Sequence, residues 1–161
     1  MHDQVKANAF NRTQWLYTGQ KLIATLSFIH GKMYLHNDLH ANNIVFRPNW
    51  DPPCPVIIDF GKATTIADPK RYNLTTEKGA EHLRKYPHLA PELLKSCSPP
   101  TFTSTKTDIF SLGFIFYRIS KHCESVYKEF REVWGRMGVP NPEKRASLTE
   151  GMCLVTSFLQ Q

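Results

Sequence analysis

The feature that most limits what this chain can fold into is a polar stretch of eight residues, numbered 36 to 43. It reads H-N-D-L-H-A-N-N and stands between an apolar pattern of helical period and a short apolar run typical of a strand. Further along, a second apolar run at residues 56–58 ends in Asp59, Phe60 and Gly61. Carboxylate and amide oxygens on two such loops are groups that bind magnesium, and the magnesium in turn binds phosphate oxygens. The two stretches together predict a magnesium–phosphate site.

The chemistry of phosphoryl transfer gives the polar residues of these stretches separate roles. A phosphoryl group in transfer spreads negative charge over several oxygens, so its site needs a hard cation held by oxygen ligands and a base near the incoming hydroxyl. Asp38 is suited to face the hydroxyl, and Asn43, on the same loop, is suited to reach the metal. Asp59 then supplies the anionic metal ligand.

The order of these stretches resembles the protein kinase family, whose catalytic loop reads H-R-D-L-x-x-x-N and whose metal loop reads D-F-G. Residues 90–92 match the family's A-P-E, and residues 107–113 resemble the Asp-led start of its large buried helix. Arg145 stands where the family places an arginine that pairs with the A-P-E glutamate. Each mark alone is weak, but their shared order favours the family over chance.

The resemblance implies an α+β fold that is mainly α-helical, a protein-kinase-like C-lobe with short β-strands around the catalytic and D-F-G loops. It implies one domain over residues 1–161, with the catalytic loop at 36–43, D-F-G at 59–61 and the activation segment at 59–92. The residues before the catalytic loop hold no Gly-rich loop, no V-A-I-K lysine and no helix with a partner glutamate. We therefore expect the chain to cover the large lobe, with the small N-terminal lobe absent.

The resemblance also implies which residues act on the substrates. Asp38 takes the position of the catalytic base, and Asn43 and Asp59 take the positions of the Mg²⁺ ligands that hold ATP. His40 is placed with the nucleotide-binding positions, where the serine/threonine kinases typically have a lysine. The end of the activation segment, residues 86–92, would form the platform that receives a substrate peptide.

Five further residues are expected to support the site rather than to act in it. By the resemblance, His36 packs beneath Phe60 of the D-F-G loop. Asp108 is expected to be buried and hydrogen-bonded to the catalytic-loop backbone, and Glu92 and Arg145 are expected to form a buried pair.

Two positions of the loop depart from the family pattern. Asn37 replaces the arginine that pairs with a phosphate on the activation segment in many kinases, so that route of control loses its main cation. His40 replaces the lysine, and the form H-x-D-L-H-x-x-N is also similar to aminoglycoside and choline phosphotransferases. The A-P-E match and Arg145 favour the protein kinases. A metal cluster of His36, Asp38 and His40 is disfavoured, because a loop with tight strands on both sides rarely converges such side chains.

Three functions are compatible with these residues. The first is ATP-dependent phosphoryl transfer to a protein hydroxyl by a truncated kinase domain that needs a small lobe. The second is a catalytically weak, pseudokinase-like module that binds a protein partner through its activation segment. The third is a small-molecule phosphotransferase of the aminoglycoside or choline kinase type. The expected ligands are ATP and Mg²⁺, with a protein substrate or protein partner.

Periodicity predicts the regular elements around these loops. Apolar residues at helical spacing predict a helix from residue 14 to Gly31, a buried helix at 108–119 and an amphipathic helix at 127–137. Ser147 and Glu150 form a capping box that begins a last helix. Strands are expected at 33–35, 44–46 and 56–58, with 49–55 as a connecting loop. The polar composition of residues 61–90 predicts a mobile activation segment. Residues 96–107 are predicted to form a loop, and residues 1–12 a frayed lead-in or the start of a short helix.

Composition limits the remaining function classes. The formal net charge is +6, but basic residues are interspersed with acidic ones, so a nucleic-acid role is not favoured. The four cysteines form no C-x-x-C pair, which indicates neither a cysteine zinc site nor a disulfide framework and favours a reducing compartment. The longest apolar stretch, 109–119, is too short to span a bilayer. We expect an intracellular, cytoplasmic protein without a membrane span.

Overall fold

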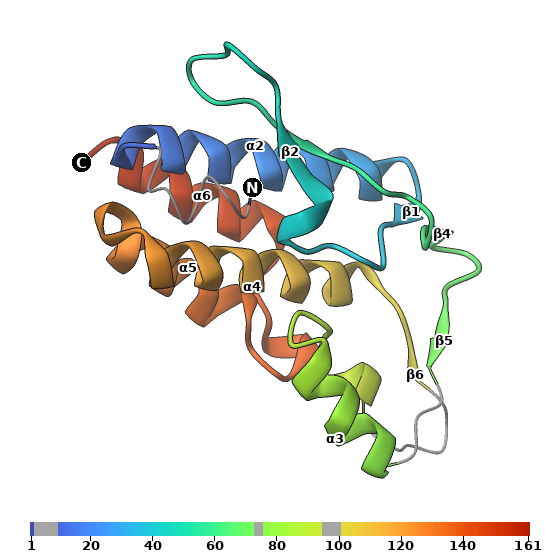
Figure 1. Cartoon of the computed structure of the whole chain (residues 1–161). Coiled ribbons are helices and arrows are strands. Elements are labelled where there is room, and N and C mark those ends of the chain that lie inside the picture. The colour runs from blue at the N-terminus through green and yellow to red at the C-terminus, as the bar shows by residue number, and fades with distance from the viewer. Residues whose placement is uncertain (2–9, 73–75, 95–100) are drawn as a thin grey trace.

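The computed structural model describes residue 1 and residues 10–72, 76–94 and 101–161. It is a mainly helical α+β fold, as predicted (Figure 1). Its main layer consists of helices that contact one another in the pairs α2–α6, α4–α5, α5–α6 and α2–α4. These helices are α2 (Arg12–Gly31), α4 (Thr105–His122), α5 (Tyr127–Met137) and α6 (Leu148–Leu159). Helix α3 (Thr76–Lys85) lies apart from this layer, at the lower edge of Figure 1.

The helices begin where the sequence provides caps. Asn11 caps α2 by accepting a hydrogen bond from the backbone N–H of Gln14 at 2.9 Å, and the Gln14 side chain accepts one from the Asn11 N–H at 3.1 Å. Ser147 and Glu150 form the predicted capping box at the start of α6. These caps satisfy backbone donors that the first turn of a helix leaves without partners.

Within the described residues, the strands are short and pair in three antiparallel, two-stranded ladders. The ladder beside the catalytic loop aligns Ile44 with Ile57 and Val45 with Val56. Because this ladder joins the chain after residue 43 to the chain before residue 59, it brings the two predicted loops to one end. The pairs are β1 (Tyr34–Leu35) with β4 (Thr64–Thr65), β2 (Ile44–Phe46) with β3 (Pro55–Ile57), and β5 (Arg71–Tyr72) with β6 (Thr101–Phe102).

Most predicted elements are confirmed, with corrections at the loops. The assignment of Pro55 to a connecting loop was wrong, because Pro55 begins β3 and aligns with Phe46 at the end of the ladder, where a strand tolerates a residue without an N–H. The predicted activation segment contains β4, β5 and α3, and the predicted loop at 96–107 contains β6 and the first turn of α4. Residues 2–9 of the predicted lead-in lie outside the described residues.

The hydrophobic core lies between α2, α4, α5 and α6. Its fully buried side chains include Trp15, Leu26, Leu112, Phe116 and Val133. Phe116 of α4 packs against Phe130 of α5 with ring centroids 4.9 Å apart. No helix among the described residues is long and apolar enough to cross a membrane. The core thus fixes α2 and α4, whose ends hold the catalytic loop.

Candidate active site

The catalytic loop is fixed by one buried carboxylate. Asp108, in the first turn of α4, is 1% exposed and accepts hydrogen bonds from the backbone N–H of His36 at 2.8 Å and of Asn37 at 2.9 Å. The ring Nε2 of His30, in the last turn of α2, lies 3.0 Å from the same carboxylate. Hydrogen bonds to a charged, buried acceptor are among the stronger ones in proteins. The loop therefore keeps a set shape at the junction of α2 and α4.

Asn37 ties this loop to the chain that follows D-F-G. Its backbone is left-handed, with φ of 64°, a conformation that asparagine adopts more readily than most residues. Its side-chain Nδ2 donates to the carbonyl oxygen of Lys62 at 3.0 Å and to Oγ1 of Thr64 at 2.8 Å. Asn37, which replaces the family's arginine, thus contacts the start of the activation segment with no phosphate involved.

Asn43 and Asp59 lie at the same end of the β2–β3 ladder. The carbonyl oxygen of Asn43 accepts a hydrogen bond from the N–H of Ile58 at 2.9 Å, which places Asn43 beside the residue before Asp59. The Asn43 Nδ2 donates to the backbone carbonyl of Asp38 at 2.9 Å, so its side-chain oxygen is the atom left for a cation. Amide and carboxylate oxygens are the ligands that Mg²⁺ prefers. The donor set therefore fits a magnesium ion.

The backbone at Asp59 is also left-handed, with φ of 64°. Its Oδ1 accepts a hydrogen bond from the N–H of Gly61 at 3.2 Å, which closes the turn of the D-F-G loop. The rings of His36 and Phe60 lie 4.9 Å apart, and Nε2 of His36 lies 3.1 Å from the carbonyl oxygen of Ile58. The expected contact between His36 and Phe60 is present, and it joins the two loops.

Asp38 lies among three nitrogen-bearing side chains. Its carboxylate is 15% exposed and accepts a hydrogen bond from Nζ of Lys62 at 2.9 Å. Nε2 of His40 lies 3.9 Å from its Oδ2, and Nε2 of His88 lies 4.0 Å from its Oδ1. The partly exposed Asp38 carboxylate is thus surrounded by one lysine and two histidines.

Burial and charge shift the pKa values of these neighbours. The hydrogen bond to Asp38 raises the pKa of Lys62, which keeps that amine charged. Burial lowers the pKa of His40 despite the nearby carboxylate. Burial, and then the charge of His40, lower the pKa of His88 to about 4. Both imidazoles are therefore held toward their neutral form beside a charged carboxylate.

Lys62 and His88 are the site residues that no motif revealed. Lys62 directly follows the D-F-G loop and brings a cation to Asp38 from the opposite loop, while residue 40, the family's lysine position, is a histidine. His88 comes from the chain just before Ala90, in the predicted substrate platform. Hollows of about 240 Å³ and 360 Å³ lie on either side of this group, the first lined by Asp38 and Lys62 and the second by His40.

Glu92 and Arg145 form a two-pronged ion pair. Nη1 of Arg145 lies 2.8 Å from Oε1 of Glu92, and Nη2 lies 2.9 Å from Oε2. Arg145 is buried, so this contact is shielded from water. The pair fixes the chain at Glu92 to the chain before α6.

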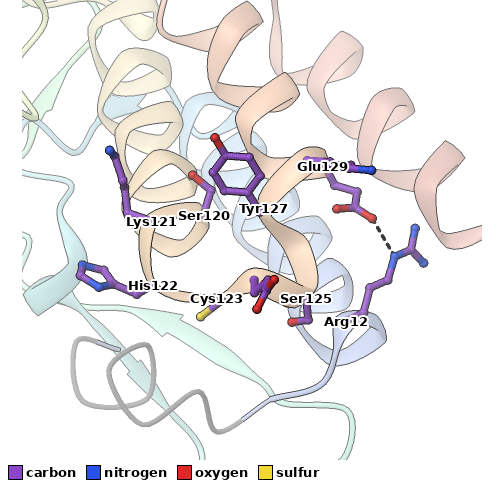
Figure 2. Close-up of a pocket in the computed structure, with 10 residues that line it drawn as sticks. Arg12, Ser120, Lys121, His122, Cys123, Ser125, Tyr127 and Glu129 are labelled. Atoms are coloured by element: carbon purple, nitrogen blue, oxygen red, sulfur yellow. Dashed lines mark hydrogen bonds and ion pairs between the residues drawn. The ribbon is translucent and has the colours of Figure 1, made fainter.

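A further hollow lies away from this chemistry. It measures about 640 Å³ and is lined by the end of α4, the start of α5 and Arg12. Figure 2 shows its lining side chains and the ion pair of Arg12 with Glu129, whose atoms lie 2.7 Å apart. Lys121 on its wall lies about 20 Å along α4 from Asp108, at 1.5 Å per residue. This hollow is larger than those near Asp38, but it contains none of the site residues.

Comparisons with known proteins agree with the geometry. The family model of the protein kinase domain matches residues 2–133. The chain is 32% identical over 100 residues to probable serine/threonine-protein kinase 2 of Plasmodium falciparum, which is 62% of this chain and 17% of that protein. It is 30% identical over 115 residues to human serine/threonine-protein kinase 16, which is 70% of this chain and 36% of that protein.

A third relative is human kinase suppressor of Ras 2, which is 29% identical over 118 residues, 68% of this chain and 11% of that protein. The chain thus spans only 11% to 36% of the length of these relatives. The family model, in contrast, covers most of the chain. The protein is therefore a member of the protein kinase domain family.

Proposed function

We propose that this chain forms the large-lobe side of a site that transfers a phosphoryl group from ATP to a protein hydroxyl. The arrangement of Asp38, Asn43 and Asp59 carries this proposal. Asp38 and Asn43 share a loop fixed to α4, and Asp59 follows the strand that pairs with the one after Asn43. Membership of the kinase domain family supports the reaction type.

In this proposal the residues divide the work between the two substrates. Asp38 accepts the proton of the acceptor hydroxyl, and the Asp38–Lys62 contact keeps a cation beside the reacting oxygens. Asn43 and Asp59 hold the metal, and His40, on the same loop, is assigned to nucleotide binding by the resemblance alone. Mg²⁺ bound there would neutralise negative charge on the phosphate oxygens. His36, Phe60 and Asp108 keep the loops in place.

The acceptor would reach Asp38 along the activation segment. The hollow of about 240 Å³ beside Asp38 and Lys62 is walled by Tyr72, Tyr86 and His88 of that segment. The paired Glu92 and Arg145 hold the far end of its wall. An open hollow of this kind suits a protein hydroxyl on an extended peptide better than an enclosed pocket would. This favours a protein acceptor over a small molecule.

The test compares two variants of the chain, alone and joined to the small lobe of a serine/threonine kinase. Asp38→Ala should lower the rate of transfer about 10²- to 10⁴-fold, which corresponds to a barrier higher by about 3 to 5 kcal/mol. Nucleotide binding should persist, because a base acts on the acceptor and not on the nucleotide. Asp59→Ala should weaken both transfer and nucleotide binding, because it removes a metal ligand. Asp68→Ala, at an exposed aspartate, is the matched control.

Transfer of labelled phosphate and binding of a fluorescent nucleotide are the two measurements. The proposal would be contradicted if the unaltered protein and both site variants transferred phosphate at the same rate, equal to the background rate. They would favour the second candidate function, a kinase-derived module that binds a protein partner. One observation already points that way, because Lys62 occupies Asp38 at 2.9 Å and competes with an incoming hydroxyl.

A further inference from the structure

Three potential metal ligands converge beside the catalytic loop. One ligand atom each from Asp38, His40 and His88 lies within 4.8 Å of the others. Asp38 and His40 share the loop, whereas His88 comes from the activation segment. The His40 and His88 rings lie 5.0 Å apart at an angle of 56°, and both Nε2 atoms face the Asp38 carboxylate. This group is separate from Asn43 and Asp59.

We propose that Asp38, His40 and His88 form a binding site for a divalent transition-metal ion of the zinc class. Two imidazoles and one carboxylate, with water as a fourth ligand, are a common ligand set for Zn²⁺. Nitrogen ligands select against Mg²⁺, which prefers an all-oxygen shell. The site therefore differs in ligand chemistry from the magnesium site proposed above, although the two share one loop.

The distances need only small adjustments to suit the metal. Ligand atoms about 2.0 Å from a tetrahedral Zn²⁺ lie about 3.3 Å from one another. One ligand atom from each of the three residues lies within 4.8 Å of the others, so no separation has to shorten by more than about 1.5 Å. The side chains of His40 and Asp38 are 28% and 15% exposed, so they can rotate and shift by that distance without disturbing the core.

The histidines are in a suitable state for coordination. A metal binds the neutral imidazole, and burial disfavours the charged form of both rings. Nδ1 of His40 accepts a long hydrogen bond of 3.3 Å from the backbone N–H of Asn42. Coordination through Nε2 would move the ring proton to Nδ1 and give up this bond, which is exposed and weak.

Lys62 is the natural competitor of the metal. Its Nζ occupies Oδ2 of Asp38 at 2.9 Å, but its side chain is 53% exposed and can swing into solvent. The metal ion and the Lys62 ammonium are both cations, so they compete for the negative charge of that carboxylate. Removing the lysine charge should therefore tighten metal binding, an effect opposite to that of removing a ligand.

Metal binding would have a consequence for transfer, and this part rests on the proposed function. Asp38 is the proposed base, and a carboxylate that coordinates a cation is a poor proton acceptor. The same ion would also fix His88, and with it the activation segment, to the catalytic loop. Zinc-class ions would then inhibit transfer without competing for Asn43 and Asp59.

The binding test uses the whole chain and Co²⁺ as a spectroscopic probe, displaced by Zn²⁺. The unaltered chain should bind one equivalent, with the visible absorption of tetrahedral Co²⁺, in the presence of excess Mg²⁺. His40→Gln and His88→Gln should each weaken binding at least about tenfold, since even residues behind the ligands contribute that much. Lys62→Met should tighten it. His122→Gln, at an exposed histidine of α4, should equal the unaltered chain.

Equal affinity in the unaltered chain and both ligand variants would overturn the proposal, as would weaker binding by Lys62→Met. Circular dichroism shows whether His88→Gln folds; if it does not, His40→Gln and Lys62→Met decide. The transfer assay with the added small lobe is read separately, as the ratio of rates with and without Zn²⁺. An inactive protein that still binds one Co²⁺ would overturn the proposed function and leave the metal site supported.

Discussion

Arg145 is a buried arginine whose guanidinium group contacts four partners. Besides Glu92, it donates to the backbone carbonyls of Lys106 at 2.6 Å, Val139 at 2.9 Å and Pro140 at 3.2 Å. A buried charge is stable only when its donors are satisfied in this way. The residue therefore joins the activation segment, the start of α4 and the loop after α5.

Replacing Arg145 should destabilise the fold strongly. Arg145→Met leaves the Glu92 carboxylate and three carbonyls without their donor, so the free energy of unfolding should fall by about 3 to 5 kcal/mol. Arg136→Met is the control, because Arg136 is 63% exposed and its pair with Glu132 lies on the helix surface at 3.4 Å. That change should stay within about 0.5 kcal/mol. Urea unfolding of both variants measures the difference, and equal midpoints would contradict it.

At the scale of single residues, the sequence motifs predict the acidic and amide residues of the candidate site. Asp38, Asn43 and Asp59 stand in ordered motifs, so their nearness follows from a resemblance. Lys62 and His88 have no such mark. Their contact with Asp38 depends on how two loops and the activation segment fold back on one another, and no local pattern encodes that.

The packing of α4 on α5 depends on one glycine. A Cβ atom at Gly113 would lie 2.9 Å from Cβ of Met137 and 3.2 Å from its backbone carbon. The two helices approach closely there because residue 113 has no side chain. Gly135 also lies in α5, but a Cβ at that position would meet nothing within 4 Å.

Alanine at these two positions should therefore act in opposite directions. Gly113→Ala should lower the free energy of unfolding by about 1 to 3 kcal/mol, because the added methyl group forces the helices apart. Gly135→Ala should raise it by about 0.5 to 1 kcal/mol, because alanine favours the helix. Thermal unfolding gives both values. A rise in stability for both variants would show that α4 and α5 can separate freely.

Helices were more predictable than strands for a physical reason. Helices α2, α4, α5 and α6 repeat an apolar contact every three or four residues, so each carries its own signal. The strands are only two or three residues long, too short for an alternation to be read. Helix α3 and the β5–β6 ladder were missed because the activation segment is polar and its partners are distant in sequence.

For the molecule as a whole, His88 should make stability depend on pH. Burial lowers the pKa of His88 from its ordinary value of 6.5 to about 4 in the folded chain, so the unfolded chain binds more protons between these pH values. Stability is therefore full above about pH 6.5 and falls as the pH drops toward 4, by up to about 3 kcal/mol. The titratable groups near His88 that influence its pKa include Asp38, His40, Lys62 and His82.

Denaturant unfolding from pH 7 to 4, with a chelator to exclude metals, measures this dependence. His88→Gln should flatten the profile, since glutamine does not titrate. His122→Gln should keep the slope of the unaltered chain, because His122 is exposed at the end of α4. Equal slopes for the His88→Gln and unaltered chains would assign the dependence to other groups.

The carboxylate of Asp108 also sets the order in which the molecule can be completed during synthesis. It holds His36 and Asn37 from 72 and 71 residues further along the chain. At about 5 to 20 residues per second, a ribosome adds that length in roughly 4 to 14 s. Throughout that interval the catalytic loop has been synthesised but lacks its main anchor. The catalytic loop, although it precedes α4 in the chain, therefore acquires its native shape only once α4 has emerged.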